Sequence, residues 1–330
     1  MSLFFKVFKF IIFIIFVYTL LPSAFAAKPV KPPIDDFYKD RYVITEFKVK
    51  AQSGDGILTL EKVLDIWGKA KPVEELKLPK RKSIPVQVGE KYIVVFSYLR
   101  KHPIYRDVIE ENPDGPTIVH GLAGSAIYHS DDALKLLFNV SEKAHVNGLV
   151  KDTSQVIDAI FTLLLNDENP RERRLAAFQY MLSNDLHTQL NSKQTKTYRN
   201  LLISQELPDL EQELLLTAAR AMPMKHRKKW LANLCRKTVD SEGAEFDLLS
   251  FVPLKVRTCI RIIEDEVDAK DVDRLTTLLY SNAPGVSKAA LRTLISWNEE
   301  QAEEIFHQVL NGNQPVHKET RRVLLTKTSE

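Results

Sequence analysis

The sequence predicts an α+β protein of more than one domain, in which a small β domain precedes an all-α helical-repeat domain (an α-solenoid). Apolar runs typical of strands are confined to the stretch before about residue 130. After residue 152 the apolar residues recur at helical spacing instead. Five prolines each precede one of these helical stripes, and they are Pro170, Pro208, Pro253, Pro284 and Pro315.

The spacing of these prolines supports a repeat. They are 38, 45, 31 and 31 residues apart, and helix-pair repeats that stack on one another have lengths in this range. Proline suits the first turn of a helix, because its φ angle is fixed and its missing N–H would have no partner there. We therefore expect about five helix pairs over residues 152–330, with a proline at the start of each second helix.

The N-terminal stretch has the composition of a secretory signal peptide. Lys6 and Lys9 precede an apolar run, and Ala24-Phe25-Ala26 has the small-x-small pattern that signal peptidase recognises. An uncleaved anchor is the alternative, but an apolar run of about 12 residues is shorter than the roughly 20 that span a bilayer core. We expect residues 1–26 to be removed near Ala26. This predicts an exported protein, periplasmic or extracellular, that is not an integral membrane protein after cleavage.

The residues after the signal are predicted to be a tether. Residues 27–40 begin with Lys28-Pro29-Val30-Lys31-Pro32-Pro33, which we expect to be extended. The formal charge of the whole chain is +3, so net charge indicates no particular partner. Export makes nucleic acid the least expected partner, and association with the cell envelope is compatible with it.

Residues 41–146 are predicted to form the small β domain. Tyr42–Val49 and Ile57–Leu64 are predicted to be a hairpin around Ser53-Gly54-Asp55-Gly56. The near-continuous apolar run Tyr92–Leu99 predicts a central strand buried on both faces. Shorter strand candidates are Thr117–Val119 and Ser125–Tyr128.

The motif Val86-Gln87-Val88-Gly89-Glu90-Lys91-Tyr92 leads into the central strand. The order of hairpin, long polar loop and this motif resembles the netrin-like, OB-type small barrels of secreted proteins, over about 90 residues. The resemblance implies a small barrel or sandwich. Animal members that inhibit metalloproteinases use N-terminal cysteines, which this sequence lacks, so the resemblance does not imply that activity.

Polar residues near the end of this domain raise the question of a metal site. His120, His129 and Asp131 are candidate ligands, because His and Asp clusters can bind divalent ions. The alternative is that Ser130-Asp131-Asp132 caps a short helix that follows. The sequence favours the cap and predicts no metal or cofactor. Gly121–Ala126 fits neither a serine-nucleophile nor a phosphate-loop motif, so no catalytic residue is predicted.

The second half of the chain resembles HEAT and armadillo-like repeats. The segment that carries the likeness is Asn169-Pro170-Arg171-Glu172-Arg173-Arg174-Leu175-Ala176-Ala177, in which proline and charged residues precede a stripe of small apolar residues. The likeness covers about 175 residues. It implies an α-solenoid, whose usual role is to hold another protein along its surface. An irregular all-α domain is the alternative.

Two cysteines, Cys235 and Cys259, lie in this half, and export would place both in an oxidising compartment. A disulfide between them would close a loop of about 25 residues and stabilise the fold by roughly 3.5 kcal/mol in the chain-entropy model. The alternative is a pair of buried free thiols that pack as small apolar groups. The sequence favours the bond and leaves the alternative open.

A run of cations in the same region predicts a basic helix face, formed by Lys225, Arg227, Lys228, Lys229, Arg236 and Lys237. Such a face could meet anionic lipid or an acidic glycan. The alternative is a solvated face whose charge is neutralised by the acidic run between Glu264 and Asp273.

We expect an exported, non-catalytic scaffold whose helical-repeat surface binds a protein partner of unknown identity. One alternative is a metal-dependent or hydrolytic module in the β domain. Another is a binder of anionic lipid or glycan that uses the basic helix face.

Overall fold

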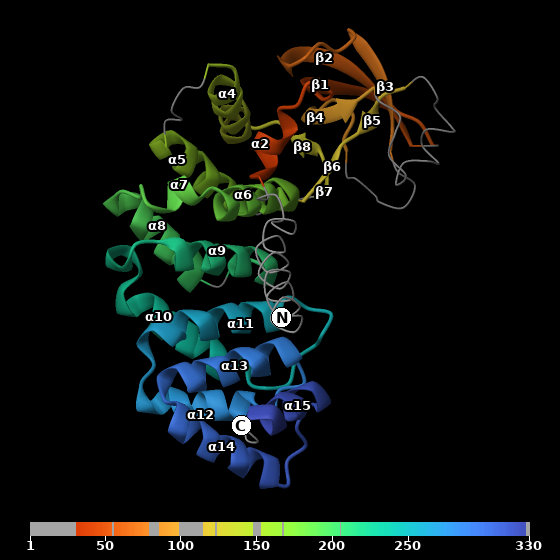
Figure 1. Ribbon diagram of the computed structural model, residues 1–330. Coiled ribbons are helices and arrows are strands. Elements are labelled where there is room, and N and C mark those ends of the chain that lie inside the picture. Colours follow the sequence, from red (N-terminus) through yellow and green to blue (C-terminus); the bar gives the residue numbers. More distant parts are fainter. Residues whose placement is uncertain are drawn as a thin grey trace, which may run out of the picture. The chain divides into compact units, whose positions relative to one another are not determined.

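The computed structural model describes residues 31–54, 56–78, 86–98, 115–122, 124–147, 153–166, 168–204 and 206–327. The side chains of residues 144, 147 and 224–228 are outside this description. The predicted signal peptide also lies outside the described residues. From Pro32 onward the described residues belong to one compact unit, which has a β-sheet region followed by a helical region (Figure 1).

The N-terminal region contains a six-stranded antiparallel sheet. Its strand order is β3-β2-β1-β4-β5, and β8 also pairs with β4. The strands are β1 (Val43–Gln52), β2 (Ile57–Trp67), β3 (Val73–Lys77), β4 (Lys91–Ser97), β5 (Thr117–Ile118) and β8 (Ile127–His129). The strands β6 (His120–Gly121) and β7 (Gly124–Ser125) form a separate two-stranded ribbon.

The strand β4 is buried on both faces, as its apolar run predicts. Tyr92, Val94 and Phe96 belong to a core on one face of the sheet. Ile93 and Val95 belong to a second core on the other face, which continues into the helical region. Successive side chains of a strand point to opposite faces, so a run without polar interruptions serves both cores.

Directly after strand β2, the backbone at Gly68 lies close to Val43 at the start of β1. Gly68 has φ +70°, a conformation that L-residues rarely adopt, and a Cβ at this position would lie 3.3 Å from Val43 Cγ2. Glycine therefore lets the chain leave β2 close to the start of β1.

The predicted tether is shorter than expected, because Pro33 begins a buried helix. Helix α2 (Pro33–Phe37) starts with this proline, and Ile34 and Phe37 are buried in the core that joins sheet and helices. The Ile34 N–H donates to Gln179 Oε1 at 2.9 Å. Tertiary contacts with residues far along the chain thus hold a segment that its prolines alone would leave extended.

The region predicted to be helical, residues 152–330, consists mainly of helices in its described part. Helix α4 (Asp132–Asn147) follows the sheet. The later helices are α5 (Thr153–Leu164), α6 (Pro170–Leu182), α7 (Asn184–His187), α8 (Ser192–Ile203), α9 (Asp209–Ala221), α10 (Met224–Glu242), α11 (Val252–Ile263), α12 (Ala269–Leu278), α13 (Pro284–Trp297), α14 (Glu299–Asn311) and α15 (Lys318–Lys327), with a 3₁₀ turn η2 (Glu264–Glu266).

Four of the five prolines mark a helix start. Pro170 and Pro284 are the first residues of α6 and α13, and Pro253 is the second residue of α11. Pro208 directly precedes α9. The prediction is wrong for Pro315, because α15 begins three residues later, at Lys318.

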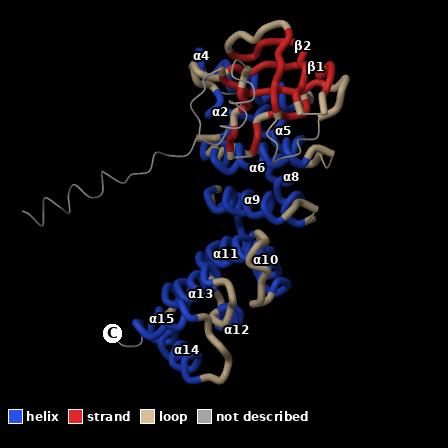
Figure 2. Tube along the Cα trace, turned by 90° about the vertical axis from the view of Figure 1, so that its right-hand side faces the viewer, coloured by secondary structure: helices blue, strands red, loops and turns tan. Residues whose placement is uncertain are grey.

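The helices pack in two layers that both views show (Figures 1 and 2). Helices α6, α9, α11 and α13 contact one another in chain order, and we call them the central layer. Helices α5, α8, α10 and α12 each pack against the central-layer helix that follows them in the chain. Buried alanines such as Ala177, Ala219 and Ala290 lie in the central layer, where a small side chain allows close helix approach.

The two cysteines are not joined. Cys235 on α10 and Cys259 on α11 are free and buried, so the expected disulfide is replaced by the alternative of two packed thiols. Burial raises the pKa of the Cys235 thiol, and the neighbouring Cys259 raises it further. Apolar packing between the two helices favours the neutral thiols.

Within the described ranges, no helix combines the length and the apolar character that a membrane crossing requires.

Candidate functional site

The structure gives the three candidate metal ligands separate partners. His120 Nδ1 lies 3.2 Å from Ser125 Oγ. Asp131 Oδ1 accepts the Leu134 N–H at 2.7 Å, so this residue caps the start of α4, in agreement with the alternative that the sequence favours. Across the described part of the chain, no three His, Cys, Asp or Glu side chains gather in a way that could hold a metal ion.

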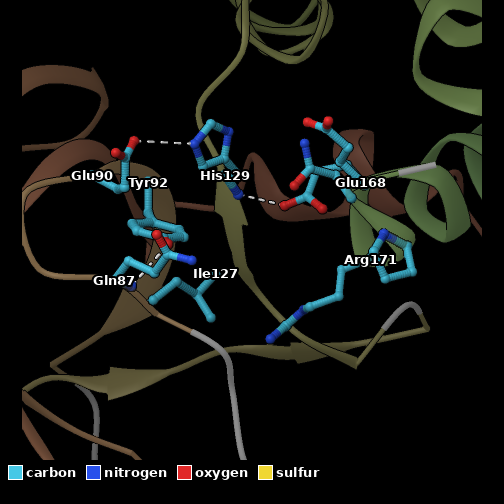
Figure 3. Close-up of a pocket in the computed structure, with 10 residues that line it drawn as sticks. Gln87, Glu90, Tyr92, Ile127, His129, Glu168 and Arg171 are labelled. Atoms are coloured by element: carbon cyan, nitrogen blue, oxygen red, sulfur yellow. Dashed lines mark hydrogen bonds and ion pairs between the residues drawn. The ribbon is translucent and has the colours of Figure 1, made fainter. Parts of the chain in front are cut away.

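The third candidate, His129, lines a polar pocket of about 300 Å³ between the sheet and the start of α6 (Figure 3). Strands β4 and β8 form one wall, and the first turn of α6 with the residues before it forms the other. The lining residues are Gln87, Glu90, Tyr92, Ile127, His129, Glu168, Asn169, Pro170, Arg171 and Glu172.

The imidazole of His129 is oriented from two sides. Its Nε2 lies 3.4 Å from Glu90 Oε2, and its ring meets the Tyr92 ring edge-on with centroids 5.6 Å apart. Figure 3 shows the ring turned toward Glu90. The main-chain N–H of His129 donates to the carboxylate of Glu172. This places a histidine and two carboxyl groups around the same pocket.

The first turn of α6 supplies the groups on the opposite wall. Glu172 is buried, and this burial raises the pKa of its carboxyl group, an effect that its hydrogen bonds only partly offset. Arg171 extends toward the strand of Ile127, donates to the Ser125 carbonyl oxygen, and lies over the Tyr128 ring. Burial lowers the pKa of Arg171.

The pocket therefore holds one group suited to donating a proton to a ligand, because the pKa of the Glu172 carboxyl is raised by burial. The same contacts also have a structural role, because Glu172 connects α6 to strand β8 through His129.

One member of the predicted basic face on α10, Arg236, is paired within the fold. The side chains of Lys225, Arg227 and Lys228 are outside the description, and Lys229 and Lys237 are exposed. Arg236 instead faces α12, where its side chain is 15% exposed and forms an ion pair with Asp271. The charge of Arg236 is thus neutralised by a residue of the acidic run between Glu264 and Asp273, which is the stated alternative to a basic face.

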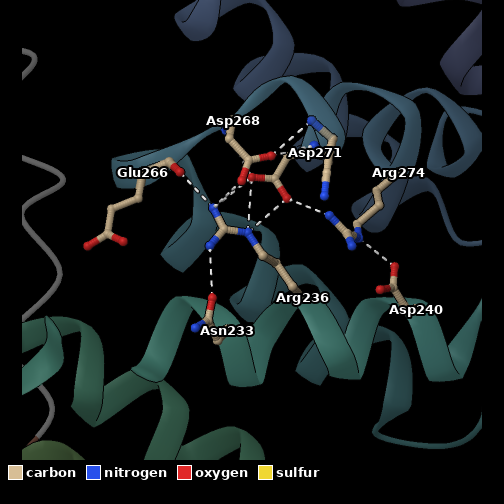
Figure 4. Close-up of polar contacts among 8 residues, drawn as sticks. Asn233, Arg236, Asp240, Glu266, Asp268, Asp271 and Arg274 are labelled. Atoms are coloured by element: carbon tan, nitrogen blue, oxygen red, sulfur yellow. Dashed lines mark hydrogen bonds and ion pairs between the residues drawn. The ribbon is translucent and has the colours of Figure 1, made fainter. Parts of the chain in front are cut away.

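Arg236 is the centre of a polar network (Figure 4). It donates to Asp271, to the Glu266 carbonyl oxygen at 2.7 Å and to Asn233 Oδ1 at 3.2 Å. Arg274 binds Asp271 Oδ1 at 2.9 Å, and its Nε donates to Asp240 Oδ1 at 2.5 Å. Burial by itself would raise the pKa of Asp271, but the hydrogen bonds and charge of Arg236 lower it overall.

A different group of cations lies on the central layer. Its members are Arg220 at the end of α9, Arg257 and Arg261 on α11, and Arg292 on α13. We call these four residues the arginine surface. Sequence reasoning missed it, because each helix contributes only one or two of its cations. The signal that could have revealed it is the outward position that each arginine takes on its amphipathic helix.

No protein-family model, curated protein or solved structure matches the chain. The structure itself shows an α+β protein, with an N-terminal antiparallel sheet region and a C-terminal region of many helices.

Proposed function

We propose that this protein is an exported, non-catalytic scaffold that binds a protein partner through its helical region. The observation that carries the proposal is the central layer, in which α6, α9, α11 and α13 lie side by side in chain order. Each of these helices is largely buried and turns a narrow stripe outward, which includes arginines on all four helices and the partly exposed Phe178, Met181 and Leu182 on α6. Side-by-side helices of this kind provide a continuous, preorganised surface for a partner.

We also infer that the helical region is a HEAT or armadillo-like α-solenoid. Its support is the pairing of each central-layer helix with the helix before it, together with prolines in or next to the first turns of α6, α9, α11 and α13. We also propose that the sheet region has a netrin-like, OB-type fold. Its support is the antiparallel order and Gly89, whose φ of +96° turns the chain into β4.

Export is proposed from the N-terminal sequence alone. N-terminal sequencing of the protein recovered from the envelope or the medium should begin at Ala27. A protein that retains its first 26 residues, or that stays in the cytoplasm, would contradict this proposal.

The binding proposal can be tested with photo-crosslinking side chains in the mature protein. Ala221 on α9 and Ser296 on α13 are exposed positions of the central layer. Lys237 on α10 and Thr277 on α12 are exposed on the other layer and serve as controls. We expect the same protein adduct from both central-layer positions and little from the controls. Adducts of equal yield at all four positions would contradict the proposed surface.

The pocket at His129 favours a second candidate, a hydrolytic module. The specific observation is the pairing of His129 with Glu90 beside Glu172, whose pKa is raised by burial. In this proposal Glu172 would donate a proton to a leaving group, and His129 would accept one from water.

The test is a panel of chromogenic esters, phosphomonoesters and glycosides. If the module is hydrolytic, His129→Gln should abolish hydrolysis of one substrate class, and the control His307→Gln, an exposed change on α14, should leave it intact. Equal activity in both variants would assign the signal to a contaminant.

A further inference from the structure

The arginine surface consists of four guanidinium groups, none of which forms a salt bridge within the described residues, although the charge of Glu264 acts on Arg261. Arg220 and Arg292 are exposed, and Arg257 and Arg261 are half-buried. Across that same part of the chain, none of the four forms an ion pair or a hydrogen bond with another side chain. In contrast, Arg236 and Arg274 on the other layer are both paired with carboxylates.

These cations are close enough to repel one another. Burial lowers the pKa of Arg261, and the charges of Arg257, Arg220 and Arg292 lower it further. The carboxylate of Glu264 acts in the opposite direction, and its Oε1 already accepts a hydrogen bond from Ser296 at 3.3 Å. Three neighbouring cations act against this one carboxylate, so a net repulsion remains at Arg261, and an anionic ligand would relieve it.

The geometry favours a chain of carboxylates over a single small anion. The arginines come from three helices that contact in the order α9, α11, α13. Packed helix axes lie about 8–10 Å apart, and an extended peptide rises about 3.3 Å per residue. A peptide that crosses these helices would therefore meet a new helix about every three residues.

The surface lacks the features expected for insertion into a lipid bilayer. None of the large apolar side chains exposed in the described residues lies on α9, α11 or α13. Membrane-surface helices combine cations with an exposed apolar face. Guanidinium groups, in addition, match carboxylates through paired hydrogen bonds.

We propose that Arg220, Arg257, Arg261 and Arg292 bind an extended acidic segment of a protein partner. The inference rests on the scaffold function proposed above and names the chemistry of the partner. The arginines lie on neighbouring helices of the central layer, so they bind carboxylates spaced along the segment and leave the apolar core between the layers undisturbed.

The probe is a fluorescent twelve-residue peptide with glutamate at every third position, and its matched control has glutamine at the same positions. Anisotropy of the mature full chain should show binding of the glutamate peptide that weakens strongly between about 0.05 and 0.5 M salt. The double variant Arg220→Gln/Arg292→Gln should bind about tenfold more weakly, since each exposed charge pair contributes modestly. Both residues are exposed, so the urea midpoint should stay unchanged.

The matched control removes two exposed cations from α10 instead. Lys229→Gln/Lys237→Gln has the same change in net charge, and its affinity should stay within about twofold of the wild type. Equal weakening by the two double variants would show that net charge alone matters and would overturn the assignment. Binding of anionic vesicles or heparin that depends on Arg220 and Arg292, without binding of the peptide, would also overturn it.

The peptide assay tests the arginine surface and the crosslinking assay tests the scaffold function, so one proposal can be wrong while the other stands. If crosslinking recovers a partner from wild type and from Arg220→Gln/Arg292→Gln equally, the scaffold function stands and the arginine surface is wrong. If crosslinking recovers no partner while the glutamate peptide binds, the surface stands and the scaffold function is wrong.

Discussion

Arg236 and Asp271 form a bidentate ion pair between α10 and α12. The guanidinium Nε lies 2.9 Å from Oδ1, and Nη2 lies 2.8 Å from Oδ2. Asp271 is 1% exposed, and its Oδ2 also accepts the Asp268 N–H at 3.0 Å as part of the α12 capping box. The pair thus connects the start of α12 to the preceding helix of the same layer.

Removal of the cation should destabilise the protein strongly. Arg236→Met leaves the buried Asp271 carboxylate with Arg274 as its remaining cation, and the loss of one partner of a buried pair costs about 3 kcal/mol. The urea midpoint should fall accordingly. Lys237→Met, the exposed neighbour, is the control and should change stability by less than about 0.5 kcal/mol. Equal midpoints for the two variants would contradict a structural role for the pair.

Stability should fall in mild acid because of His187. This residue is 1% exposed, and its Nε2 lies 2.7 Å from the Tyr180 carbonyl oxygen. Burial lowers the pKa of His187, so the folded state resists the proton that the unfolded chain takes up below about pH 6.5. The stabilising effect is complete above that pH and is lost as pH falls toward the folded-state pKa.

The variant His187→Gln keeps a donor for Tyr180 and removes the titration. Its free energy of unfolding should depend less on pH below 6.5, by up to about 1.4 kcal/mol per pH unit. Urea titrations at several pH values measure this slope. The exposed His307→Gln should retain the wild-type slope, and an unchanged slope in His187→Gln would refute the assignment.

Gly68 should be intolerant of a side chain. Its φ of +70° is unfavourable for any residue with a side chain. A Cβ at this position would also lie only 3.3 Å from Val43 Cγ2, which adds to the strain. We expect Gly68→Ala to cost about 1–2 kcal/mol in thermal or urea unfolding. Gly54 has no heavy atom within 4 Å of such a Cβ, so Gly54→Ala is the matched control. Similar stability of the two variants would argue against strain at this turn.

The two thiols should be free but protected. Both cysteines are buried and the pKa of Cys235 is raised by burial, so a thiol reagent should react slowly with the folded protein. Unfolding without reductant should release two reactive thiols per chain, the number of cysteines in the sequence. A count near zero would mean that Cys235 and Cys259 are oxidised in the purified protein.

Local patterns were enough to predict most elements, whereas long-range contacts explain the errors. Proline geometry and helical spacing anticipated α6 and α13 within a residue or two. Helix α2 was missed because the contact between Ile34 and Gln179 joins residues 145 positions apart. The short strand β3 was missed because Glu74 and Glu75 interrupt its apolar pattern.

The candidate sites were less predictable than the fold, for the same reason. Arg236 counted as part of a basic face because its partner Asp271 is 35 residues away in the sequence. His129 was identified as a polar candidate, but its neighbours Glu90 and Glu172 come from separate elements. Proximity in space, which sequence spacing does not reveal, determines which of these charges are paired within the fold and which can meet a ligand.

Helix α2 limits where recombination could divide this chain into parts that still fold. It contacts both α4 and α6, and Ile34 and Phe37 share one apolar core with the sheet and the helices. A gene fragment that encoded only residues 152–330 would lack these side chains and expose the surface they cover, and the complementary fragment would expose the opposite surface. We therefore expect recombination to transfer the sheet and at least the first helix pairs together.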